Sequence, residues 1–100
     1  MQITHQLQHG SYHVTMRGSF TFSDHLAFRD ILKEMATEGV NNVAFYLSEV
    51  EFVDSAALGM LLLARESAEK QHKNLTLHGA TGQVKKMFDM SQFERLFTLR

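Results

Sequence analysis

Residues 43–64 hold the pattern that most restricts the fold of this chain, because an extended apolar segment leads into a helix-like apolar segment. Val43–Leu47 is nearly continuous in apolar residues, which is typical of a strand buried on both faces of its sheet. Residues 48–53 are expected to form a loop. The polar step Asp54-Ser55 then precedes an apolar run, which predicts a helix whose first half is deeply packed.

Ser55 is therefore expected at or near the N-terminus of a helix, and two roles fit that place. A helix N-terminus has unpaired N–H groups and partial positive charge, so a serine there is well placed to carry a phosphate. Serine is also a preferred helix cap, and capping serines are far commoner than regulatory ones. The spacing alone favours the cap and leaves the phosphate open.

The N-terminal residues predict a β-hairpin. Residues 3–8 alternate apolar and polar side chains, His9-Gly10 offers a turn, and residues 12–17 alternate again. Residues 18–23 are expected to form a loop or a short third extension.

A helix is predicted to begin near Ser23-Asp24, with Ser23 as the candidate cap, and to stop at Gly39. Its apolar face is formed by residues at helical spacing, namely Phe28, Ile31, Leu32 and Met35. Farther along, residues 75–78 predict a strand and residues 84–88 a third helix. Residues 93–97 repeat helical spacing, although 97–99 fit a short extended tail equally well.

This order of elements predicts an α/β fold with a small mixed sheet of about four strands, packed with three to four helices in a single domain over residues 1–100. In open sheets of this type, function tends to lie at the carboxyl ends of strands, where loops meet helix N-termini. Ser55 falls at such a place.

Composition narrows the class of protein. The net charge is −1, and no basic stripe with aromatic residues indicates a nucleic-acid surface. The chain has no cysteine, which fits a reducing compartment. No secretion signal is recognisable, and the longest apolar run is too short to cross or insert into a bilayer. We therefore expect a cytoplasmic domain.

Other chemistry has little support in the sequence. Six histidines are present, at positions 5, 9, 13, 25, 72 and 78, but none has the spacing of a metal site. A hydrolytic Ser55 would need a histidine base and an orienting acid, and no Gly-x-Ser-x-Gly elbow is present. We expect no enzyme activity, no metal and no cofactor.

Residues 43–59, Val-Ala-Phe-Tyr-Leu-Ser-Glu-Val-Glu-Phe-Val-Asp-Ser-Ala-Ala-Leu-Gly, resemble the signature of STAS domains, and of bacterial anti-sigma-factor antagonists in particular. That signature is an apolar strand, a short loop, an Asp-Ser step and an apolar helix. The resemblance covers essentially the whole chain, since the early Gly18 loop and the 75–79 strand also fall where the family has theirs.

The resemblance implies a switch. In this family the serine after the aspartate is phosphorylated by a partner, a GHKL-type serine kinase that is often itself the anti-sigma factor, and a PP2C-type phosphatase resets it. The unphosphorylated form binds the partner and frees a sigma factor. Carried over by position, Ser55 is the phosphoacceptor and Asp54 its acidic neighbour, and the partner-binding residues are Thr21, Glu51, Asp54, Ser55 and Ala56.

Three residues depart from the family pattern. Tyr46 stands where many members have an aspartate at the end of the third strand, and Thr21 stands where many have another acidic residue. Ala57 replaces a glycine, at little expected cost in a helix. The first two departures imply altered recognition by the kinase.

The resemblance also leaves an alternative. Small stand-alone STAS proteins serve as constitutive subunits of ABC-type lipid transport complexes, and their tail helix is similar to Thr81–Met90. Their partner is an ABC ATPase rather than a soluble kinase.

Overall fold

The computed structural model describes all 100 residues, which form five strands, three α-helices and two short 3₁₀ helices. The strands are β1 (Gln2–Gln8), β2 (Ser11–Phe20), β3 (Asn42–Val53), β4 (Asn74–His78) and β5 (Thr98–Leu99). The helices are η1 (Phe22–Asp24), α1 (His25–Met35), α2 (Ser55–Lys70), α3 (Gly82–Met90) and η2 (Phe93–Arg95).

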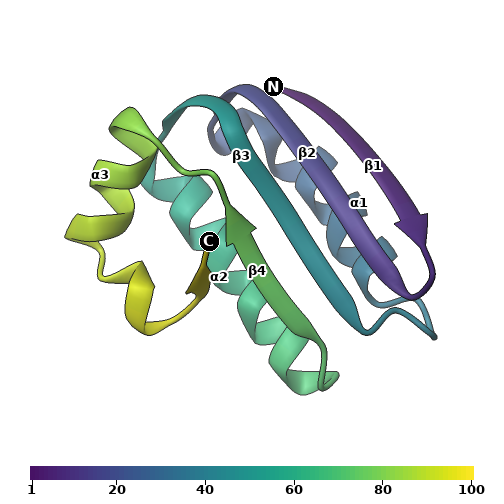
Figure 1. Cartoon of the computed structure of the whole chain (residues 1–100). Coiled ribbons are helices and arrows are strands. Elements are labelled where there is room, and N and C mark those ends of the chain that lie inside the picture. The colour runs from purple at the N-terminus through teal and green to yellow at the C-terminus, as the bar shows by residue number, and fades with distance from the viewer.

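All the strands belong to one sheet, in the order β1-β2-β3-β4-β5. β1 and β2 are antiparallel and form the predicted hairpin, whereas the other neighbours are parallel. α1 and α2 lie side by side against one face of the sheet, and the other face has no helix over it (Figure 1). The predicted mixed α/β fold is confirmed, with the short β5 as a fifth strand.

One hydrophobic core fills the space between the sheet and the helices. Val14, Phe45 and Leu77 are neighbours across three strands and are almost completely buried. Phe45 meets Phe28 of α1 edge to face, with ring centroids 5.9 Å apart. Every buried side chain is apolar or aromatic, so the packing of one sheet face against α1 and α2 supplies the core.

The strand β3 is longer than the sequence indicates. Residues 48–53, expected to be a loop, continue β3 because β2 also runs on to Phe20 and pairs with them as far as Phe20↔Val53. The register shifts between Thr15 and Arg17 and between Gly18 and Ser19. These irregularities break the alternation of buried and exposed residues, which is why the strand period is not visible in the sequence.

The first helix also begins differently from the prediction. A 3₁₀ turn precedes α1, with Thr21 as its N-cap, and Asp24 is the N-cap of α1. The Ser23 hydroxyl instead lies 2.8 Å from the Thr21 hydroxyl, so the prediction that Ser23 caps the helix is wrong. Thr21 and Asp24 occupy the two cap positions, and the Asp24 carboxylate accepts a hydrogen bond from the Thr21 N–H rather than from α1. α1 ends at Met35, before Gly39.

The apolar composition of α2 suggested that its first half is packed on all sides. The structure shows packing on one side only. The inner face of α2 is buried, but Gly59, Leu62 and Leu63 are exposed. The predicted ion pair between Glu66 and Lys70 is confirmed at 3.3 Å. α2 therefore presents an outer face that begins at Ser55 and is partly apolar.

Candidate functional site

The residue that starts α2 is Asp54. Its backbone is extended, and its carboxylate Oδ1 accepts a hydrogen bond of 2.8 Å from the Ala57 N–H. Asp54 is therefore the N-cap, and Ser55 is the first residue of the helix. The interpretation of Ser55 as the cap is wrong because a carboxylate makes a stronger, charge-assisted bond to a helix N–H than a hydroxyl does.

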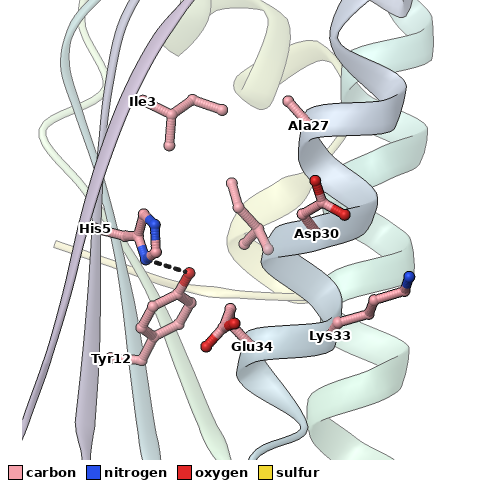
Figure 2. Close-up of a pocket in the computed structure, with 8 residues that line it drawn as sticks. Ile3, His5, Tyr12, Ala27, Asp30, Lys33 and Glu34 are labelled. Atoms are coloured by element: carbon pink, nitrogen blue, oxygen red, sulfur yellow. Dashed lines mark hydrogen bonds between the residues drawn. The ribbon is translucent and has the colours of Figure 1, made fainter.

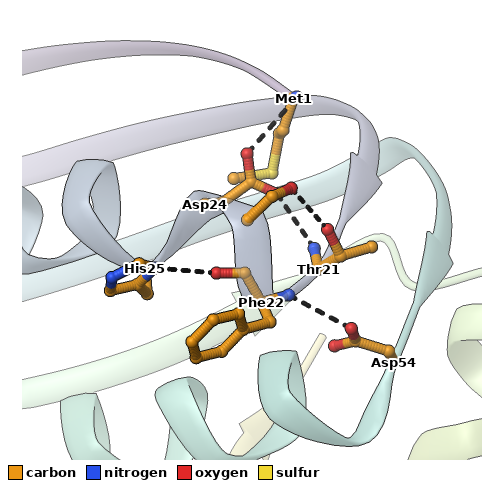
Figure 3. A network of polar contacts seen from close by, with 7 residues as sticks. Met1, Thr21, Phe22, Asp24, His25 and Asp54 are labelled. Carbon is orange, nitrogen blue, oxygen red and sulfur yellow. Dashed lines mark hydrogen bonds and ion pairs between the residues drawn. The ribbon is translucent and has the colours of Figure 1, made fainter.

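The second oxygen of Asp54 ties α2 to the loop that follows β2. Oδ2 accepts a hydrogen bond of 3.1 Å from the Phe22 N–H (Figure 3). The Asp54 N–H donates to the Phe20 carbonyl at 3.4 Å. Thr21 lies between these two anchor points. The structure thus brings Thr21 and Asp54 into one site, although they are distant in sequence.

The β2–α1 loop is held by further polar contacts. The Thr21 N–H donates to Asp24 Oδ2 at 2.9 Å, and the amino group of Met1 lies 3.4 Å from the other Asp24 oxygen (Figure 3). His25 Nδ1 lies 2.9 Å from the Phe22 carbonyl oxygen. This loop therefore presents the exposed Phe22 ring in a fixed position beside α2.

The Ser55 side chain is exposed and is free of a capping role. The first N–H groups of a helix have no partner within the helix, and Asp54 occupies that of Ala57. The N–H groups of Ser55 and Ala56 are thus left facing the helix end, where they favour added negative charge. The electrostatic potential at Ser55 therefore has two opposing sources, the positive ends of these N–H dipoles and the negative charge of the neighbouring Asp54 carboxylate.

The two acidic residues before Asp54, Glu49 and Glu51, line one shallow depression together with Arg17, Thr81 and other residues. Glu49 also forms an exposed ion pair with Arg17. No hydrogen bond or shared depression joins Glu51 to Ser55, so of the predicted partner-binding residues Glu51 is the one that the structure does not link to the others.

Exposed apolar side chains lie on the segments that the Asp54–Phe22 bond joins. Phe22 is 62% exposed, and its ring stacks on His25 with centroids 4.6 Å apart. Leu26 follows one turn later in α1 and is 60% exposed, and Leu62 lies on the outer face of α2. Sequence reasoning missed Phe22, His25 and Leu26, because the pattern placed them in a loop and at a helix start and could not show that they face outward.

Comparison with known proteins identifies the family. A family model described as "Mlab, STAS domain" matches residues 3–99. The chain belongs to the STAS domain family. A STAS-domain containing protein of Pseudomonas aeruginosa (strain UCBPP-PA14) is 34% identical over 86 residues, which cover 86% of this chain and 84% of the relative.

Other similar proteins are described as anti-sigma factor antagonists. The anti-sigma-B factor antagonist of Staphylococcus epidermidis is 25% identical over 85 residues, covering 85% of this STAS domain and 79% of the relative. A solved structure, a candidate anti-sigma factor antagonist from Thermotoga maritima, has a TM-score of 0.88 at 17% identity and covers 97% of this chain and 84% of that one. Both of these similar proteins are described as anti-sigma factor antagonists, which agrees with the membership of this chain in the STAS family.

The resemblance placed Tyr46 at the end of the third strand, but in this STAS domain β3 continues well beyond it. Tyr46 lies within the long β3, on the face opposite to that of its neighbours Phe45 and Leu47, which are buried in the core. Its hydroxyl lies 2.9 Å from His13 Nδ1, and its ring lies 4.8 Å from that of His78. Tyr46 is thus part of a polar row across three strands rather than part of the Ser55 site.

Gln83 of α3 holds the carboxyl end of β3. Its side-chain carbonyl accepts the Val53 N–H at 2.9 Å, and its side-chain amide donates to the Val53 carbonyl at 3.0 Å. A single side chain thus satisfies both backbone groups of the residue before Asp54, as a neighbouring strand would. The sequence contains no signal for this contact.

Two other properties bear on the class of function. No three His, Asp or Glu side chains are grouped so that they could hold a metal ion. None of the helices combines the length and the apolar character that crossing a membrane requires.

Proposed function

We propose that this STAS domain is an anti-sigma factor antagonist or a related regulatory adaptor whose binding to its partner is switched off by phosphorylation of Ser55. The observation that carries this proposal is the exposed Ser55 hydroxyl at the first residue of α2, released from capping by Asp54. The names of its relatives support the same role.

A phosphate on Ser55 has opposite consequences for the fold and for the partner. It adds about −1.5 to −2 charges at pH 7. Within the chain, the free N–H groups at the start of α2 offset its repulsion from Asp54. A partner surface fitted to a neutral hydroxyl and to the exposed Phe22 ring would have to desolvate the phosphate instead. Binding is therefore lost while the fold persists.

Two partner proteins follow from this role. The unphosphorylated form binds an anti-sigma factor that is also a GHKL-type serine kinase, and a PP2C-type phosphatase removes the phosphate. Binding extends from Thr21 and Asp54–Ala56 onto Phe22 and Leu26, because the Asp54 contacts hold these segments side by side. The protein acts in the cytoplasm, where such kinases and phosphatases act, and performs no catalysis itself.

The first experiment is peptide mass spectrometry on the protein from its native cells, with and without phosphatase treatment. We expect a phosphate on Ser55 that treatment removes. Ser55 unmodified across growth conditions would contradict the proposal.

The second experiment measures the affinity of the purified STAS domain for the serine kinase or ABC ATPase encoded near its gene. Ser55→Asp is expected to weaken binding to a kinase by about 100-fold or more, since like-charge contacts at an interface cost several kcal/mol. Ser55→Ala should bind as the wild type does. Ser91→Asp adds the same charge at an exposed residue after α3 and serves as the matched control.

The outcomes separate the proposal from the alternative of a constitutive transporter subunit. Binding to a kinase that Ser55→Asp abolishes and Ser91→Asp retains supports the switch. Binding to an ABC ATPase that is unchanged by Ser55→Asp would indicate a subunit of an ABC-type lipid transport complex.

A further inference from the structure

β1 forms an open edge of the sheet, and no element lies beyond it (Figure 1). Its residues include no Lys, Arg, Asp, Glu, Pro or Gly, and they pair with β2 without a register shift. Proteins usually guard such an edge with charges, proline, bulges or very short strands. The opposite edge follows this rule, because β5 has only 2 residues. β1 is therefore an unguarded edge that can accept another strand.

The sequence of β1, Gln-Ile-Thr-His-Gln-Leu-Gln, is self-complementary about its centre. If a second β1 lies antiparallel beside the first with His5 opposite His5, Ile3 lies opposite Leu7 and Gln2 lies opposite Gln8. Residues directly opposite in an antiparallel pair point to the same face. Ile3 and Leu7 then meet on one face, on both sides of the His5 pair, and the residues that meet on the other face are all polar.

Other registers fit less well. A two-fold axis normal to the sheet keeps all helices on one side, so only shifts that preserve the facing of side chains are allowed. A shift to an axis at Thr4 or Gln6 places Ile3 or Leu7 opposite His5 and shortens the pair. The register centred on His5 pairs the full length of β1 and keeps like with like.

The helix-facing side of β1 has uncovered apolar surface. Ile3, His5 and Leu7 are on this side, since their partners in β2 are buried. Leu7 is 53% exposed, and Ile3 and His5 line a cleft of about 440 Å³ between β1 and α1 (Figure 2). Contact between Leu7 and Ile3 of a second copy would remove apolar surface from water at both ends of the pair.

We propose that two copies of this chain associate through antiparallel pairing of their β1 strands, with the two-fold axis at His5, so that the two sheets become one. Such a two-fold interface uses the same edge of both copies, so the assembly stops at two copies. The two Ser55 sites then lie at opposite ends of the joined sheet, because the paired strands run in opposite directions. Both sites stay accessible, so the proposal is independent of the proposed phosphorylation switch.

The first test is the oligomeric state, measured by sedimentation velocity from low micromolar to near-millimolar protein. A pair of single strands is smaller than a standard interface of about 1,600 Å², so we expect a dimer with a micromolar dissociation constant. Leu7→Lys should weaken the dimer about tenfold or more, because edge lysines oppose strand pairing. Leu63→Lys is the matched control, since Leu63 is 54% exposed on α2.

The second test fixes the register by single cysteines, since the chain contains none. In the proposed register the two copies of position 5 have Cα atoms about 4.5–5.5 Å apart, within the range of a disulfide. The two copies of position 7 are about 13 Å apart, which is too far. Under mild oxidation, His5→Cys should form a covalent dimer and Leu7→Cys should not. Mixed Thr4→Cys and Gln6→Cys copies should crosslink to each other, which repeats the test with His5 intact.

Each outcome decides the proposal. A concentration-dependent dimer, weakened by Leu7→Lys and crosslinked only at the predicted positions, supports it. A protein that stays monomeric over the whole range, a dimer unaffected by Leu7→Lys, or crosslinking that is equal for His5→Cys and Leu7→Cys would overturn it.

Discussion

At the scale of single residues, Asp54 organises the site. Its two carboxylate oxygens have separate tasks, since Oδ1 caps α2 and Oδ2 holds the backbone of Phe22. This division leaves the Ser55 hydroxyl without a structural role and places it beside an exposed aromatic ring. The Asp-Ser step therefore combines a structural residue with a modifiable one, and the two functions should be separable by mutation.

We expect Asp54→Ala to lower the free energy of unfolding by about 2 kcal/mol, through loss of the helix cap and of the charge-assisted bond to Phe22. Asp54→Asn, which keeps one acceptor oxygen, should lose less. Ser55→Ala should change stability by less than about 0.5 kcal/mol, because the Ser55 side chain is exposed. Urea unfolding followed by circular dichroism measures all three. Equal losses for Asp54→Ala and Ser55→Ala would contradict this division of roles.

At the scale of elements, the end of β3 depends on α3. Val53 is buried, and both of its backbone groups are bonded to the Gln83 side chain. Gln83→Met keeps a side chain of similar length but leaves these groups without partners, which should cost about 1–3 kcal/mol. Hydrogen exchange measured by NMR should show faster exchange of the Val53 amide, with little change at Phe45 in the middle of β3. Unchanged protection of the Val53 amide would show that the two hydrogen bonds from Gln83 are not needed to hold the end of β3.

The elements also show what the sequence can predict. The apolar face of α1 and the alternation in the hairpin follow from periodicity, and the structure confirms both. The continuation of β3 over residues 48–53 could not be predicted, because register shifts remove the period of two. The contact of Gln83 with Val53 joins residues 30 positions apart, and no local pattern encodes it.

At the scale of the whole molecule, the order of strands and helices was enough to predict a mixed sheet with Ser55 at the carboxyl end of a strand. It could not predict the surfaces on which function depends. The position of the exposed Phe22 near the start of α2 arises because Asp54 joins the β2–α1 loop to α2, and the free edge of β1 arises from its position in the sheet. Both are properties of tertiary arrangement, whereas periodicity reports only which residues share a face.

The sheet face without helices carries a row of His13, Tyr46 and His78, and the environment of His78 in this row predicts a pH-dependent stability. Burial lowers the pKa of His78 below its usual value of 6.5, and the charges of Arg100 and His13 lower that pKa further. Well above pH 6.5, His78 is uncharged in both the folded and the unfolded chain. As the pH falls below 6.5, the unfolded chain binds a proton at His78 before the folded chain does, so the free energy of unfolding decreases.

We therefore expect the urea midpoint of the wild type to fall between about pH 7.5 and about pH 5.5. In His78→Gln this part of the fall should disappear, because glutamine does not titrate but can still bond to the Thr76 hydroxyl, which lies 2.8 Å from His78 Nε2. Comparing the change in midpoint between the two pH values, rather than the midpoints themselves, cancels any constant cost of the substitution. The same fall in both proteins would mean that protonation of His78 does not oppose folding, which would contradict this prediction.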